Sequence, residues 1–221
     1  MSSSPECTAR PHDGVMVELL PALSNRRARR AFATTSVEAE DEALLWRAVA
    51  VAPSHGNTQP TRIVIARSMQ VRSALLAALS EGNRQWATAA PLLFALAVVP
   101  AHDTPQPNSD GTIRELWTFH AGIAAANLMA QATELGLLAH PMAGFDEVAA
   151  RAAFGFPPEA RIVAVFAVGY PGEPESLAED LRARETVAQD RLPTEHFVAE
   201  DRWTAILEVS AREFRKQRPR S

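Results

Sequence analysis

The sequence predicts an α+β fold in which a central mixed β-sheet is flanked by helices. Three apolar runs have the length of buried strands: RIVIA at 62–66, PLLFALAVV at 91–99 and ARIVAVFAVGY at 160–170. Helical patterns separate these runs, which is typical of a sheet covered by helices. The stretch at 113–138 is rich in alanine and apolar on nearly every side, so it predicts a long, buried helix.

The segment before the first strand contains two predicted helices. Residues 15–32 begin as a short helix and continue into a run of arginines. Thr35 and Glu38 fit a capping box, which predicts the start of a helix over 37–52. Pro53 ends that helix, because the residue before a proline is disfavoured in the α conformation.

The remaining elements follow from composition and periodicity. Residues 71–79 predict a helix, and the continuous apolar run at 91–99 predicts a strand buried on both faces. Residues 101–112 have the composition of a loop, and 200–217 predict an amphipathic helix at the periphery. The long helix carries small residues that allow close packing, namely Ala121, Gly122, Ala124, Ala125 and Ala126.

Composition excludes several classes of protein. With 221 residues, 47% hydrophobic residues, 22% charged residues and a net charge of −4, the chain is predicted to be globular and gives no reason to bind nucleic acid. Its longest apolar run is about half of the roughly 20 residues that a membrane span needs, and the first 14 residues lack the apolar core of a signal peptide. A cytoplasmic protein with a mobile leader at 1–14 is therefore expected.

Most kinds of catalytic or metal site are also excluded. The chain has one cysteine, and its six histidines show no ligand spacing, so no metal site is predicted. G-x-S-x-G, P-loop, G-x-G-x-x-G and H-E-x-x-H motifs are absent, and no catalytic pair of carboxylates stands out. We expect His120, inside the apolar helix, to be a core histidine with a backbone partner rather than a ligand.

Two polar segments have the chemistry of a ligand site. NRRARRAF at 25–32 places four arginines within five residues, which suits either a solvated basic face or a phosphate site. APSHGNTQP at 52–60 is rich in amide and hydroxyl side chains between two prolines. It suits either an ordinary polar loop or a loop that recognises the edge of a flat heterocycle, because amide side chains both donate and accept.

Three weaker segments accompany them. EGNRQW at 81–86 places Asn83 ahead of a buried strand, and HPMAGFD at 140–146 consists largely of small residues that allow a backbone to approach a planar ligand. Arg191 lies beside proline in an otherwise polar stretch.

In this order and spacing, the five segments resemble the FMN-dependent nitroreductase family. That family has an arginine-rich first element, then A-P-S-x-x-N-x-Q-P followed by a strand, which RRARRAF, APSHGNTQP and RIVIA match here. NRQW, TELGLL, PMAGF and VGYP match its later elements, so the likeness covers roughly residues 17–195. The resemblance implies an FMN-binding domain at 15–198 and a charged tail at 199–221.

The resemblance also implies a set of cofactor-binding residues. Arginines would hold the FMN phosphate and ribityl end, with Ala28 in place of the usual serine. The 52–60 loop would line the flavin ring or the dimer side of its pocket, Asn83 would bond the ring edge, and 141–144 would lie against the ring. The implied residues are Arg26, Arg27, Ala28, Arg30, Pro53, Ser54, His55, Asn57, Gln59, Asn83, Pro141, Met142, Ala143, Gly144 and Arg191.

The implied activity is that of an NAD(P)H-dependent oxidoreductase with the chemistry on flavin N5 and no catalytic side chain. A nitroaromatic, quinone or conjugated carbonyl acceptor would use the same slot as the reductant, in ping-pong order, and the protein would be a homodimer. Two alternatives stay open: a non-catalytic flavin-binding protein and a domain that has lost FMN. Trp86 stands where the family often has lysine, and a Trp86 that blocks the nicotinamide slot would favour the first alternative. The acceptor, and the choice between NADH and NADPH, are left open.

Overall fold

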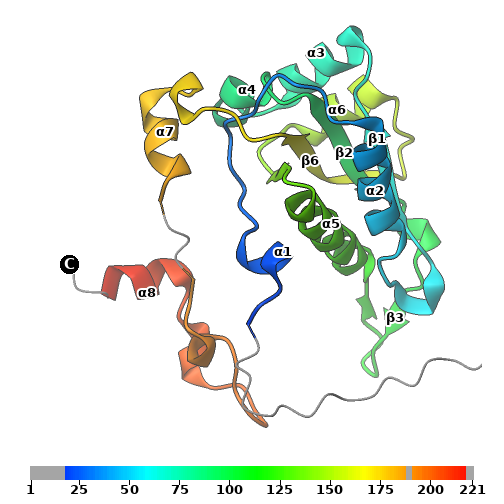
Figure 1. Cartoon of the computed structure of the whole chain (residues 1–221). Coiled ribbons are helices and arrows are strands. Elements are labelled where there is room, and N and C mark those ends of the chain that lie inside the picture. The colour runs from blue at the N-terminus through cyan, green and yellow to red at the C-terminus, as the bar shows by residue number, and fades with distance from the viewer. Residues whose placement is uncertain (1–17, 188–190, 218–221) are drawn as a thin grey trace, which may run out of the picture.

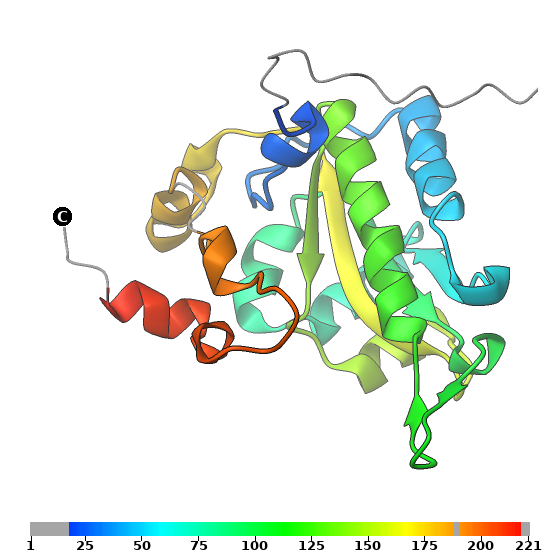
Figure 2. The same cartoon turned by 90° about the horizontal axis from the view of Figure 1, so that it is seen from below.

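Four strands form the central sheet in the order β1-β2-β6-β5, in a computed structural model that describes residues 18–187 and 191–217 (Figure 1). The predicted leader at 1–14 lies outside these residues. A separate two-stranded hairpin, β3–β4, projects from the body (Figure 2). The strands are β1 (Thr61–Ile65), β2 (Leu92–Val98), β3 (Gln106–Pro107), β4 (Ile113–Arg114), β5 (Leu138–Met142) and β6 (Arg161–Gly169).

Helices cover both faces of the sheet. The helices α2 and α5 pack together against one face, and α3, α4 and α6 lie on the other (Figures 1 and 2). None of the described helices is long and apolar enough to cross a bilayer. The helices are α1 (Pro21–Ser24), α2 (Ala39–Ala50), α3 (Met69–Ala78), α4 (Glu81–Ala87), α5 (Trp117–Glu134), α6 (Glu147–Phe154), α7 (Glu179–Glu185) and α8 (Ala211–Gln217), with short 3₁₀ turns η1 (His55–Asn57), η2 (Pro100–His102), η3 (Pro174–Ser176), η4 (Thr194–His196) and η5 (Ala205–Glu208).

The α+β class is confirmed, but the sheet is antiparallel at each described pair rather than mixed. The long helix α5 connects β2 to β5, and these two strands run in the same direction. The later strand β6 inserts between them and runs antiparallel to both. The direction of each strand relative to its neighbours therefore depends on the order of the strands in the sheet. An apolar run in the sequence does not encode that order.

The strand β2 divides the core into two layers, because successive side chains of a strand point to opposite faces. Leu92, Phe94 and Leu96 belong to the layer under α2 and α5, whereas Leu93 and Ala95 belong to the layer under α3, α4 and α6. All seven residues of β2 are buried, as the continuous apolar run predicted. Phe94 stacks on its register partner Phe166 with the ring centroids 5.2 Å apart.

Several local predictions are wrong. The capping box is absent, because α2 begins after Glu38 and has no side-chain cap. The 101–112 loop contains one strand of a hairpin. EGNRQW and the start of HPMAGFD, for which the sequence predicts no secondary structure, lie in helix α4 and strand β5. The predicted helix over 200–217 is divided into η5 and α8. These elements are short, so tertiary contacts decide their conformation more than local propensity does.

Candidate functional site

The arginine-rich segment 26–30 has no regular secondary structure and is held at the end of β6. An isolated bridge joins Phe32 to Pro171, and the Gly172 N–H donates to the Ala31 carbonyl at 3.0 Å. A Cβ at residue 172 would lie 2.4 Å from the carbonyl carbon of Phe32, so only glycine permits this approach. These backbone contacts fix where the arginine segment ends.

Glu185 on α7 holds the last arginine of the segment. Its side chain is 1% exposed, and both of its oxygens accept hydrogen bonds of 3.0 Å from the backbone N–H of Arg30. The Arg30 guanidinium also donates to Glu185 Oε1, at 3.3 Å. A buried carboxylate is costly unless it is paired, so this contact stabilises the segment only with both partners present. The Arg30 side chain is thus engaged with protein, whereas the resemblance gave it to the phosphate.

Arg26, Arg27 and Arg191 form a group of like charges. The pKa of Arg26 is lowered from its usual range, first by partial burial and then by the nearby positive charges of Arg191 and Arg27. The fold therefore brings Arg191 to the predicted arginine run from the far end of the chain. Like charges held close together favour an anion among them, and guanidinium groups match the geometry of phosphate.

A cavity of about 500 Å³ opens beside Arg27 and the later arginines of the segment. This volume lies within the range of roughly 300–1,000 Å³ found for ligand and cofactor pockets. Cationic side chains dominate its wall, so its donor set fits a phosphate-bearing group such as the FMN phosphate. It is lined by Arg27, Ala28, Arg29, Arg30, Arg184, Glu185, Thr186 and Val187.

His140 connects this segment to the edge strand β5. Its Nδ1 lies 2.9 Å from the carbonyl oxygen of Arg29, which can only accept, so Nδ1 carries the proton. Burial is the main cause that lowers the pKa of His140, and the charge of Arg30 lowers it further, while the Arg29 carbonyl and Glu185 oppose the shift. The Trp86 ring lies 4.5 Å from the His140 ring, centroid to centroid. Trp86 is only 2% exposed, so it is a core residue in this protomer.

Asn83 and the segment after β5 are also brought together. The Gly144 carbonyl accepts hydrogen bonds from Asn83 Nδ2 at 3.0 Å and from the Ser80 N–H at 2.8 Å. A Cβ at residue 144 would lie 2.6 Å from Ser80 Oγ, so a larger residue there would have to displace the Ser80 side chain. Within the predicted 141–144 group, Met142 is buried in the core and Ala143 is exposed.

The predicted residues of the 53–59 segment, here called the amide loop, lie elsewhere. This loop leads into β1, whereas Arg29 and Gly144 are tied to β5 and the residues that follow it. The strands β1 and β5 are the two opposite edges of the sheet, three strand spacings or about 14 Å apart. Both views show this separation between the loop and the arginine segment (Figures 1 and 2). One protomer therefore does not bring Pro53, Ser54, His55, Asn57 and Gln59 to the arginines.

The amide loop satisfies many of its own polar groups. Ser54 Oγ accepts from the Gln59 N–H at 2.9 Å, and Gln59 Nε2 donates to Asn57 Oδ1 at 3.0 Å. The loop needs this support because Gly56, Asn57 and Gln59 have positive φ angles of 55°, 57° and 45°. Such angles cost a residue with a Cβ roughly 1–2 kcal/mol.

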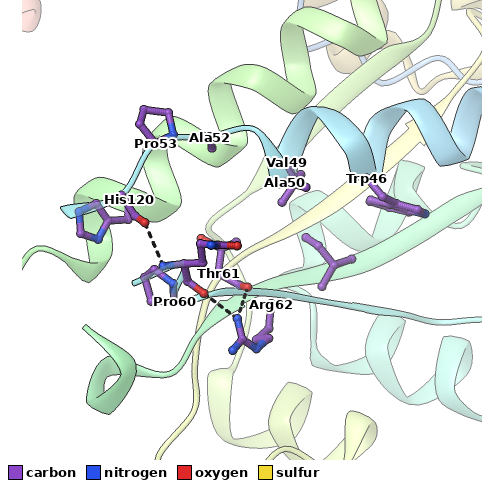
Figure 3. Close-up of a pocket in the computed structure, with 12 residues that line it drawn as sticks. Trp46, Val49, Ala50, Ala52, Pro53, Pro60, Thr61, Arg62 and His120 are labelled. Carbon is purple, nitrogen blue, oxygen red and sulfur yellow. Dashed lines mark hydrogen bonds between the residues drawn. The ribbon is translucent and has the colours of Figure 1, made fainter. Parts of the chain in front are cut away.

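A second cavity, of about 270 Å³, lies between the amide loop, α2 and α5 (Figure 3). Pro53 and His120 are at one side of it and Trp46 at the other (Figure 3). Arg62 closes the floor near the loop, where its Nη1 donates to the Gln59 carbonyl at 2.7 Å. His120 is buried and accepts a hydrogen bond from the backbone of His55, so its prediction as a core histidine with a backbone partner is confirmed.

The sequence reasoning missed three residues that shape these regions. The sequence does not indicate a special position for Glu185, because a single carboxylate in a charged stretch is typical of a surface residue. His140 belongs to a segment that was identified by its small residues, and its strand is only five residues long, which is too short for a clear periodic pattern. Asp103 lies in a stretch with the composition of a loop, yet it is buried beside His120. In each case, burial and partner come from distant parts of the chain.

Comparison with known proteins decides the family. The sequence profile described as "Nitroreductase family" matches residues 23–85 and 71–170, which together span more than half of the chain. The chain belongs to this family. A "Putative NADH dehydrogenase/NAD(P)H nitroreductase" of Streptomyces coelicolor is 27% identical over 168 residues, covering 70% of this chain and 83% of the relative.

Solved structures of the family share the fold. An "oxidoreductase containing FMN" superposes with a TM-score of 0.74 at 27% identity, covering 92% of this chain and 99% of that chain. A "putative nitroreductase in complex with FMN" from Desulfovibrio desulfuricans superposes with a TM-score of 0.63 at 20% identity, covering 83% of this chain and 96% of that chain. The second likeness, at its lower identity, supports the fold alone. The α+β architecture is thus that of nitroreductases.

Proposed function

We propose that this nitroreductase-family chain is an FMN-dependent oxidoreductase that uses NAD(P)H to reduce nitroaromatic, quinone or conjugated carbonyl acceptors in ping-pong order. The observation that carries the proposal is the group of arginines beside the 500 Å³ cavity. Burial is the main cause that lowers the pKa of Arg26, and an anion there would offset the further lowering by the positive charges of Arg191 and Arg27. The relatives named above, one an oxidoreductase containing FMN, support a flavin as the carrier of that anion.

Different residues of this chain would bind different parts of FMN. Arg26, Arg27 and Arg191 would hold the phosphate, since their positive charges are gathered there, while Arg30 shapes the cavity through Glu185. Asn83 and the 141–144 segment would lie along the ring, near the edge strand. When bound, FMN supplies N5 as the atom that accepts hydride, so the protein needs no nucleophile.

A second copy of the chain would complete the site. Within one protomer the amide loop and the arginines flank opposite edges of the sheet, so a loop that lines the flavin must come from a partner. The helix α5 offers a surface for that partner: Phe119, which is 64% exposed, Gly122 and Ala126 form an exposed stripe of apolar and small residues. Light scattering at micromolar concentration should give the mass of a dimer, and a monomer mass would contradict this arrangement.

The absorption spectrum of the purified protein tests the proposal. After incubation with FMN and desalting, the protein should keep a visible flavin band that bleaches when NADPH or NADH is added without oxygen. A protein that keeps no band after FMN is supplied would refute the proposed cofactor. A band that neither reductant bleaches would refute the proposed activity and favour the flavin-binding alternative.

A further inference from the structure

Asp103 and His120 form a buried ionisable pair beneath the amide loop. Their side chains are only 4% and 3% exposed, and His120 Nδ1 lies 3.5 Å from Asp103 Oδ2. His120 is in the first turn of α5, and Asp103 follows η2 at the start of the hairpin segment. Buried polar groups are costly without partners, so each atom of the pair needs one.

The other nitrogen of His120 faces the loop. Its Nε2 lies 3.0 Å from the backbone N of His55. A backbone N–H can only donate, so Nε2 must present its lone pair. The ring proton of neutral His120 then sits on Nδ1, on the side of Asp103.

Asp103 is held in one orientation by two donors. Its Oδ1 accepts from the Thr104 N–H at 2.9 Å and from the Thr58 hydroxyl at 3.3 Å. This leaves Oδ2 directed at His120. Thr58 and His55 lie on either side of Gly56 and Asn57, so the pair holds the loop at both flanks of its positive-φ turn.

We propose that Asp103 and His120 are positioning residues for the amide loop. The Asp103 carboxylate holds His120 in the Nδ1–H tautomer, which leaves Nε2 to hold the His55 amide and fixes the loop in one shape. The consequence for cofactor binding rests on the proposed function, in which this loop lines the flavin. The contacts of Asp103 and His120 with the amide loop, here called the clamp, do not depend on a cofactor.

The variant Asp103→Asn separates tautomer control from simple packing. Thr104 and Thr58 still donate to its Oδ1, so its amide nitrogen faces His120 Nδ1 and donates to it. The ring proton must then move to Nε2, where it meets the N–H of His55. The variant keeps the shape of the side chain and reverses the polarity of the contact.

The first measurement is made on the cofactor-free protein. ¹⁵N spectra of the imidazole should show His120 as the Nδ1–H tautomer, and amide exchange at His55 should be slow. Asp103→Asn should shift the tautomer and speed His55 exchange about tenfold or more. His120→Leu, which has neither donor nor acceptor, should do the same to exchange, and His120→Gln should restore most of the protection because its amide offers one acceptor and one donor.

The matched control is Asp110→Asn, the same carboxylate-to-amide change at an exposed residue of the hairpin turn. It should leave His55 exchange and the His120 tautomer unchanged. An Nε2–H tautomer in the unmodified protein, or unchanged His55 exchange in both Asp103→Asn and His120→Leu, would overturn the clamp.

The second measurement is FMN affinity, read by quenching of flavin fluorescence. Asp103→Asn and His120→Leu should weaken it about tenfold, with His120→Gln close to the unmodified protein. Unchanged affinity alongside faster exchange would overturn the link between the clamp and the flavin. A protein that binds no FMN in any form would refute the proposed function, while the exchange data would still decide the clamp.

Discussion

The arginine segment and the amide loop are both irregular, polar and next to an edge of the sheet, but they differ in how their polar groups are satisfied. In the arginine segment, partial burial and the nearby positive charges of Arg191 and Arg27 lower the pKa of Arg26. In the amide loop, neutral side chains bond one another, as Gln59 does with Asn57. The first region thus favours an external anion, whereas the second already has an internal network that sets its shape.

The two regions also depend on different anchors. Glu185 of α7 holds the arginine segment through the backbone and side chain of Arg30. Asp103 and His120 hold the amide loop through the His55 N–H and the Thr58 hydroxyl. In both regions a buried acidic residue from a distant part of the chain positions residues that the sequence marks as ligand-binding. The comparison indicates that the motif residues and their anchors have separate functions, which substitutions can separate.

The largest expected effect is on cofactor affinity at the arginine segment. The double substitution Arg26→Ala with Arg27→Ala removes two charged donors, each worth about 1.5–3 kcal/mol. FMN should bind at least about 100-fold more weakly, since about 1.4 kcal/mol is tenfold in affinity. Fluorescence titration measures this, with Arg114→Ala on the exposed hairpin as the control. Equal affinity in the double variant and the control would mean that these arginines do not hold the phosphate.

The next effect is on stability at the anchor of that segment. Glu185→Ala leaves the N–H of Arg30 without its acceptor and should lower the free energy of unfolding by about 2 kcal/mol. Glu185→Gln keeps a neutral acceptor and should cost about half as much. Urea denaturation measures both, and Glu179→Gln, at an exposed position of the same helix, should stay within about 0.5 kcal/mol. A Glu185→Ala protein as stable as that control would show that Glu185 does not anchor the arginine segment.

A smaller effect is expected in the amide loop. Asn57→Ala and Asn57→Gly both delete the side chain that accepts from Gln59, but only alanine is strained at a φ of 57°. The alanine variant should therefore be less stable than the glycine variant by about 1 kcal/mol. Thermal and urea denaturation of the pair measure this difference. Equal stabilities would show that the turn relaxes without cost.

The smallest expected effect is a change in the pH dependence of stability. The pKa of His140 in the folded protein is lowered from the ordinary 6.5, mainly by burial, so the unfolded chain binds a proton that the folded protein resists. Stability from this residue is complete above pH 6.5 and is lost as the pH falls through the lowered pKa. His140→Gln should flatten this part of the profile, whereas His102→Gln, at an exposed site, should not. A steeper or unchanged profile for His140→Gln would contradict the assignment.

The residue types of the candidate site were largely predictable from the sequence, but their arrangement in space was not. The arginine run, Asn83 and the 141–144 segment were identified from residue types and their order, and the fold ties these segments to one edge of the sheet. The amide loop was identified from the same kind of evidence, yet it lies at the opposite edge of the sheet. Residue types indicate which ligand chemistry is available, but the order of strands in a sheet determines which segments meet.

The sequence by itself determined the α+β class, the buried strands and the segments with ligand chemistry, because apolar periodicity and side-chain type are local properties. Only the tertiary structure decided that Arg26 lies near Arg191, that Glu185 holds Arg30 and that Asp103 faces His120. The insertion of β6 between β2 and β5 also belongs to the tertiary structure. These pairings depend on burial and on contacts between residues far apart in the chain, and their energies exist only once the two layers of the core have packed on the sheet.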